Sequence, residues 1–134
     1  MRHNPKRRST LLGKRGEDLA CSYLHDHGYI IVERNWRCVT GEIDIVAREG
    51  STLVVVEVKT RSSLVAGHPL EAITQAKLGR LRLLAGAWCQ ATEQRSARSR
   101  LGAFRIDAIR IDAIGVVMPL GQPPSVLHIR GVES

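Results

Sequence analysis

The sequence predicts a single α/β domain in which about five strands form a central sheet flanked by helices. A chain of 134 residues, 43% hydrophobic and 25% charged, has the size and composition of one globular domain with one core. Segments with helical spacing of apolar residues and short β-branched runs follow in the order α-β-β-β-α-β-β. No repeat divides them, so we expect one domain over residues 10–134 and a disordered basic arm over residues 1–9.

A first helix is predicted from Thr10, a suitable N-cap, to about His27. Its inner face consists of residues at helical spacing: Gly16, Leu19, Ala20, Tyr23, Leu24 and His27. Gly28 suits the left-handed conformation that ends many helices. The β-branched residues that follow predict a strand over 29–33.

The centre of the chain predicts a β-hairpin. Residues 42–47 and 52–60 are strands rich in Ile and Val, and residues 48–51 are the turn, in which Gly50 supplies a positive φ. Both strands are apolar on both faces. We therefore expect them to lie in the middle of the sheet with helices over both faces.

The second half of the chain predicts a helix and the remaining strands. Pro69 fits the first turn of the helix, with His68 as its cap. One stripe of that helix contains Leu70, Ile73, Lys77, Leu81, Leu84 and Trp88, with the Lys77 stem passing along it. Residues 104–111 predict a strand, 114–118 its continuation or its partner, and 126–129 a short edge strand. Asp107 and Asp112 are expected to face solvent or to pair with local arginines.

The formal net charge of +7 favours polyanionic partners. Six basic residues precede the first acid, Glu17, and Arg95, Arg98 and Arg100 form a second cluster in a serine-rich stretch expected to be an exposed loop. Such segments either contact phosphates or are solvated, and charge alone favours neither. Three widely spaced cysteines form no disulfide or zinc pattern, and no run approaches the roughly 20 apolar residues of a membrane span. We expect a cytoplasmic protein without a membrane partner.

Two acids interrupt the apolar strands of the hairpin. With a two- or four-residue loop, Asp44 falls directly or diagonally opposite Glu57 on one face of the sheet, whereas a three-residue loop places them on opposite faces. Lys59 and Glu42 project to the same side as Glu57 and Asp44, respectively. Adjacent carboxylates repel, and a Mg²⁺ ion would resolve the conflict. The alternative is a Glu57–Lys59 salt bridge with Asp44 and Glu42 in solvent.

Asp44 followed by Glu57-Val-Lys59 is similar to the PD-(D/E)xK signature of restriction-endonuclease-like nucleases, with Ile43 in place of the usual proline. The wider motif is Gly16-Glu17, then residues 41–47, then 56–61, then residues 104–107. This combination resembles the bacterial YraN-like family, which is related in fold to archaeal Holliday junction resolvases. The resemblance covers about residues 13–114 and implies a restriction-endonuclease-like domain with a mixed central sheet.

The resemblance also implies roles for individual residues. Asp44 and Glu57 would be metal ligands for Mg²⁺, with Mn²⁺ as a substitute, and Lys59 the catalytic lysine. Glu17 matches an acid that approaches the metal in resolvase-like relatives; a solvated first-turn acid is the alternative. Glu42 and Gln75 are accessory candidates, Gln75 being otherwise a surface residue. The residues expected to contact DNA are Arg7, Arg8, Lys14, Arg15 and Arg61.

Three functions are compatible with these features. The first is a Mg²⁺-dependent endonuclease that acts on branched or otherwise structured DNA, because no insertion offers base-reading elements. Such an enzyme would cut two strands as a homodimer. The second is a nucleic-acid-binding module with the nuclease fold, little activity and a partner protein. The third is a structural protein whose basic segments bind RNA or another acidic partner.

Overall fold

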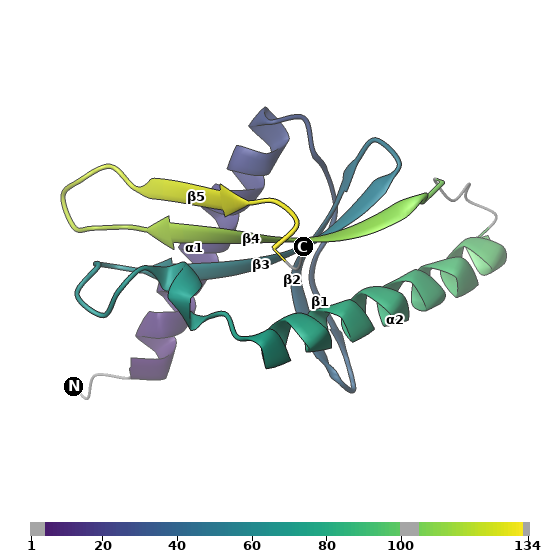
Figure 1. Cartoon of the computed structure of the whole chain (residues 1–134), viewed down its shortest axis with the longest axis horizontal. Coiled ribbons are helices and arrows are strands. Elements are labelled where there is room, and N and C mark those ends of the chain that lie inside the picture. Colours follow the sequence, from purple (N-terminus) through teal and green to yellow (C-terminus); the bar gives the residue numbers. More distant parts are fainter. Residues whose placement is uncertain (1–4, 100–104, 133–134) are drawn as a thin grey trace.

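The computed structural model of the chain describes residues 5–99 and 105–132, without the side chains of 5–10 and 95–99. Its elements are α1 (Pro5–Asp26), β1 (Ile30–Cys38), β2 (Gly41–Glu49), β3 (Thr52–Arg61), the 3₁₀ turn η1 (Pro69–Ala72), α2 (Gln75–Ser99), β4 (Ala108–Val117) and β5 (Ser125–Ile129). One strongly twisted sheet lies between the two helices (Figure 1). In the described part of the chain, no helix is apolar and long enough to cross a bilayer.

The five strands follow the chain order β1-β2-β3-β4-β5. All neighbouring pairs are antiparallel except β3 and β4, which are parallel because η1 and α2 form the crossover between them. The sheet is therefore mixed, and the domain is consistent with a restriction-endonuclease-like fold. The hairpin strands β2 and β3 are interior strands, which confirms the expectation from their apolar sequences.

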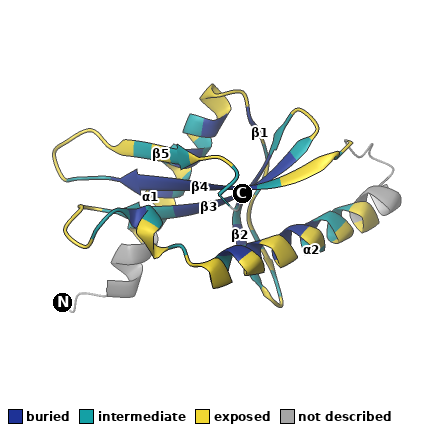
Figure 2. Ribbon diagram, in the orientation of Figure 1, coloured by how far each residue is buried: buried dark blue, intermediate teal, exposed yellow. Residues whose placement is uncertain are grey.

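Each face of the sheet has its own apolar core. The core under α1 contains Ala20, Leu24, Tyr29, Ile45, Ala47, Val54, Val56, Val58, Ile114 and Val116. The core under α2 contains Ile43, Val46, Leu53, Val55, Leu78, Leu81, Leu84, Ala85, Trp88 and Ile111. Buried colouring follows β3, β4 after its exposed first residues, and the inner side of α2, while the outer side of α2 is exposed (Figure 2). Both faces of the hairpin are thus covered, as predicted.

Both helices differ from the prediction at their ends. α1 begins at Pro5 instead of Thr10, because proline is favoured at a first helical position and no breaker follows before Gly13. Residues 5–9 of the predicted arm are therefore helical, and residues 1–4 lie outside the described ranges. α2 continues to Ser99 through the stretch predicted as a loop, because alanine, glutamine and arginine favour a helix.

The helix predicted from Pro69 is divided in two. His68 caps the short turn η1, its Nδ1 accepting a hydrogen bond from the Leu70 amide at 3.1 Å. The chain then becomes extended at Ile73, and α2 starts anew at Gln75. Thr74 caps this second start, because its hydroxyl accepts from the Lys77 amide at 3.1 Å.

Among the strands, β1 is longer than predicted, and the hairpin turn is tighter. β1 extends to Cys38 because it pairs with β2 along its length. Glu49 pairs with Thr52, which leaves only Gly50 and Ser51 in the loop. β4 is one continuous strand that starts at Ala108, so residues 114–117 continue it, and β5 is the predicted edge strand.

Asp112 is a charged side chain in the buried part of β4. It is fully buried, so of the two expected alternatives the solvent-facing one is wrong and the pairing with a local arginine is confirmed. Arg110 Nε donates to its Oδ1 at 2.7 Å, the Gly131 amide donates to the same oxygen at 3.0 Å, and His128 Nε2 lies 2.7 Å from Oδ2. Burial would raise the pKa of Asp112, but these hydrogen bonds outweigh it and hold that pKa well below the usual range.

We expect Asp112→Ala to reduce the free energy of unfolding by about 3–5 kcal/mol, because it leaves Arg110 without its buried partner. Asp107→Ala is the matched control, since Asp107 also pairs with an arginine two residues away, Arg105, but at the surface. Its cost should be below about 1 kcal/mol. Urea unfolding of both variants at neutral pH measures the difference, and equal costs would show that the buried network contributes no more than a surface pair.

Candidate functional site

The site lies where the β2–β3 ladder ends. Regular pairing runs from Glu49 and Thr52 to Ile45 and Val56, so the two-residue loop sets the register in which Asp44 and Glu57 come next. There a side chain takes the place of a backbone carbonyl as acceptor: Asp44 Oδ2 accepts a hydrogen bond from the Val58 amide at 2.9 Å. The two acids of the hairpin are therefore neighbours at the end of a buried ladder.

Glu57 is buried among apolar strands, with 4% of the residue exposed. Burial raises the pKa of Glu57 from its ordinary 4.5 to about 7, the negative charge of Asp44 adds to the rise, and Lys77 and Lys59 oppose it. The pKa of Asp44 is also raised, mainly by burial, against the hydrogen bond from Val58. Both carboxylates are thus held in surroundings that do not fully compensate their charges.

Glu17 approaches this end of the hairpin from α1, the helix that covers the other face of the sheet from α2. Gly16 permits the approach, because a Cβ atom there would overlap the side chain of Thr60 on β3. Glu17 lies well inside the helix and its side chain is only 19% exposed, so it is not a solvated first-turn acid. Its Oε1 is buried without a hydrogen-bond partner, with Arg34 Nη2 3.9 Å away. Burial, and then the charge of Asp44, raise the pKa of Glu17.

Two lysines approach the buried carboxylate of Glu57. Lys59 Nζ lies 3.5 Å from Glu57 Oε1, and Lys77 Nζ lies 3.8 Å from the same oxygen. The first is the lysine of the sequence motif. The second comes from the first turn of α2, and it was predicted only as part of that helix's inner stripe. A lysine among the apolar residues of that stripe was the available signal for a place in the site.

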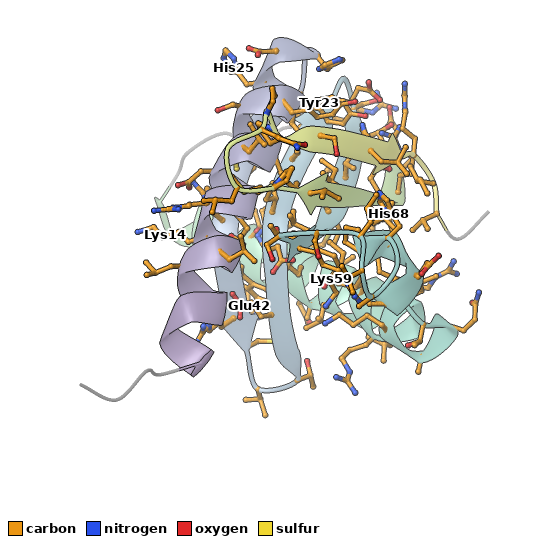
Figure 3. The ribbon with its side chains drawn as sticks, turned by 90° about the vertical axis from the view of Figure 1, so that its left-hand side faces the viewer. Lys14, Tyr23, His25, Glu42, Lys59 and His68 are labelled. Carbon is orange, nitrogen blue, oxygen red and sulfur yellow. The ribbon has the colours of Figure 1, made fainter. Side chains whose placement is uncertain are left out.

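The accessory candidates lie around these groups. Glu42 pairs with Arg37 at 3.3 Å, and Figure 3 labels it below and to the left of Lys59. Its charge acts on both Asp44 and Glu17. Gln75 is exposed at the start of α2, two residues before the lysine that reaches Glu57.

The predicted DNA contacts are only partly described. Lys14 and Arg15 are exposed on α1, on the turn that precedes Glu17. Arg61 follows the site on β3, and its Nη1 donates to the Ala66 carbonyl at 3.1 Å. The side chains of Arg7 and Arg8 lie outside the described ones.

The donor set fits a hard cation. Within residues 5–99 and 105–132, no three His, Cys, Asp or Glu side chains are close enough to hold a metal by themselves. Mg²⁺ is usually held by one or two carboxylates, with water and phosphate oxygens in the remaining positions. Asp44 and Glu57 can supply those two carboxylates, and the buried Oε1 of Glu17 has no hydrogen-bond partner. The residues present therefore suit Mg²⁺ or Mn²⁺.

Comparison with known proteins gives one consistent family. The model of the uncharacterised protein family UPF0102 matches residues 16–116. A UPF0102 protein of Clavibacter michiganensis subsp. michiganensis is 51% identical over 119 residues, which are 89% of this chain and 92% of the relative. A UPF0102 protein of Arthrobacter sp. strain FB24 is 49% identical over 126 residues, 94% of this chain and 98% of the relative.

We expect the metal-free protein to lose stability as the pH rises from about 4.5 to about 7, because the folded state binds the Glu57 proton more tightly than the unfolded state. Below that window Glu57 is protonated in both states and costs nothing. Above it the full cost is present, on the order of 3 kcal/mol. Glu57→Gln should remove this part of the pH dependence and be more stable than the wild type at pH 8.

Urea unfolding in EDTA between pH 4.5 and 8 measures the effect. Glu93→Gln is the control, because Glu93 is an exposed acid on α2. If the free energy of unfolding of Glu57→Gln depends on pH as steeply as that of Glu93→Gln, the prediction is contradicted.

Proposed function

The chain belongs to the uncharacterised protein family UPF0102, and from that premise we propose that it is a Mg²⁺-dependent endonuclease acting on branched or otherwise structured DNA. The observation that carries the proposal is the pairing of buried Glu57 with half-buried Asp44, with Lys59 beside Glu57. These two carboxyl groups at the end of the ladder and that of Glu17 on α1 all have raised pKa values, which is unfavourable for folding, so a structural role does not explain them. A divalent cation would compensate their charges.

Each residue then has a defined part in hydrolysis of a phosphodiester. Asp44 and Glu57 would hold the cation, which supplies Lewis-acid stabilisation of the phosphate and lowers the pKa of a bound water. The Val58 amide fixes the orientation of Asp44. Lys59 places an ammonium group beside Glu57, where it can donate to a phosphate oxygen as negative charge develops on it. Glu17 adds a third carboxylate from the α1 side.

The charge and the surface of the protein support DNA as the substrate. A net charge of +7 attracts polyanions, and exposed Lys14 and Arg15 lie on the helix that presents Glu17. The described residues, 5–99 and 105–132, contain no insertion suited to reading base edges, which favours recognition of DNA structure over sequence. We further propose that the protein acts in the cytoplasm, and as a homodimer when two strands are cut.

A second candidate is a DNA-binding module with little catalytic activity. It is favoured by the two lysine ammonium groups beside Glu57 Oε1, because they neutralise part of the negative charge of the site without a metal ion. The two candidates differ in whether cleavage accompanies binding.

We expect the purified protein to cut labelled four-way-junction DNA in Mg²⁺ or Mn²⁺ but not in EDTA. Asp44→Ala and Glu57→Ala should each reduce the rate by more than about 100-fold, because each removes a metal ligand. Single-stranded and duplex DNA are the comparison substrates, and Glu93→Ala, which removes an exposed acid, is the control. Cleavage that both site variants retain would overturn the nuclease proposal. Binding without any cleavage would favour the second candidate.

A further inference from the structure

We propose that Lys77 is a second substrate-contacting lysine, which forms with Lys59 a two-ammonium site for one phosphodiester group of the DNA. In the free protein Glu57 Oε1 occupies this anion site. The choice of a phosphodiester as the anion rests on the proposed nuclease function, whereas the convergence of the two ammonium groups is a feature of the folded chain.

The two lysines reach one oxygen atom from different layers of the fold. Lys59 lies on β3 and Lys77 on α2, and their Nζ atoms are 3.5 and 3.8 Å from Glu57 Oε1. The side chain of Glu57 is 6% exposed, while those of Lys59 and Lys77 are 38% and 32% exposed. The carboxylate is thus deeper than the lysines that pair with it. An anion that arrives from solvent meets the ammonium groups first.

The position of Lys77 in its helix does not favour stability. Lys77 is the third residue of α2, in a first turn that contains no acidic residue. A cation at this end of a helix interacts unfavourably with the helix dipole, and an acid would be preferred there. The partial positive charge of the helix N-terminus instead adds to that of the lysine. Together they favour an anion at this point.

The charges of the site also favour a second lysine. The acids Glu17, Glu42, Asp44 and Glu57 and the cations Arg34, Lys59 and Lys77 together leave one net negative charge when all are ionised. A divalent cation would turn this into one net positive charge, which one phosphodiester neutralises. Without Lys77 the cation alone would neutralise the site, and no charge would remain for the substrate.

The test is DNA binding by Lys77→Met and Lys77→Arg, measured with fluorescent four-way-junction DNA in Ca²⁺ over a range of salt concentrations. We expect Lys77→Met to bind about five- to tenfold more weakly at fixed salt, and the negative slope of log K against log salt to become shallower by about 0.9. Lys77→Arg keeps the charge and should keep the slope. Arg105→Gln is the matched control, because it removes one positive charge near Ser51, at the opposite end of β3.

Thermal melting of each variant separates a folding defect from a binding defect. If Lys77→Met melts at a lower temperature than the wild type, Lys77→Gln replaces it. The proposal is then supported if the slope of log K against log salt is the same for Lys77→Arg and the wild type and shallower for Lys77→Gln. If a folded Lys77→Met binds as tightly as Arg105→Gln and with the same salt slope, the proposal is overturned.

A wild type that binds but never cuts in Mg²⁺ would refute the nuclease function and leave the salt slopes to decide on Lys77. Cutting that requires Asp44, with binding indifferent to Lys77, would refute only the role of Lys77.

Discussion

The β2–β3 hairpin is apolar on both faces, and burying both faces at once is the constraint from which the rest of the molecule follows. Ile45 and Val56 belong to the core under α1, whereas Val46 and Val55 belong to the core under α2. Each such side chain contributes about 1.5–3 kcal/mol when it is removed from water, so neither helix is dispensable. The same requirement brings two helices to one pair of strands. Where the ladder ends, side chains from both layers approach Asp44, because its charge acts on Glu17 of α1 and the charge of Lys77 on α2 acts on Asp44 itself.

Two buried acids on neighbouring strands, Asp112 and Glu57, differ in how their charges are compensated. They are close in register, because Asp112 on β4 pairs with Val56 on β3 and the next residue of β3, Glu57, pairs with Ala113. Asp112 receives hydrogen bonds from Arg110 and Gly131 and lies against His128, so it stays ionised although it is fully buried. Glu57 is instead paired with two lysines, at 3.5 and 3.8 Å, and its pKa remains raised. The chain can therefore saturate a buried carboxylate, and it does so at Asp112 but not at Glu57.

Local sequence predicted the hairpin, and it predicted neighbouring acids for a two- or four-residue loop, because this geometry depends on short-range rules. Gly50 favours a tight loop, the loop fixes the register, and the register places Asp44 next to Glu57. The burial of Asp112 was not predictable in this way, because its partner His128 is 16 residues away on another strand. The place of Lys77 in the site was missed for the same reason. It depends on the break at Ile73, which sets where α2 starts above the sheet.

The pairing of Glu57 with two ammonium groups also links the two proposals energetically. Glu57 cannot serve a divalent cation and two lysines equally well, because the cation and the ammonium groups compete for one carboxylate and repel one another. A cation on Glu57 would leave Lys59 and Lys77 without their internal partner and available to a phosphate. A phosphate on the lysines would likewise free Glu57. Under the two proposals each ligand would therefore favour the other, and the coupling would be equal in both directions. The site would gain its affinity for DNA together with its metal.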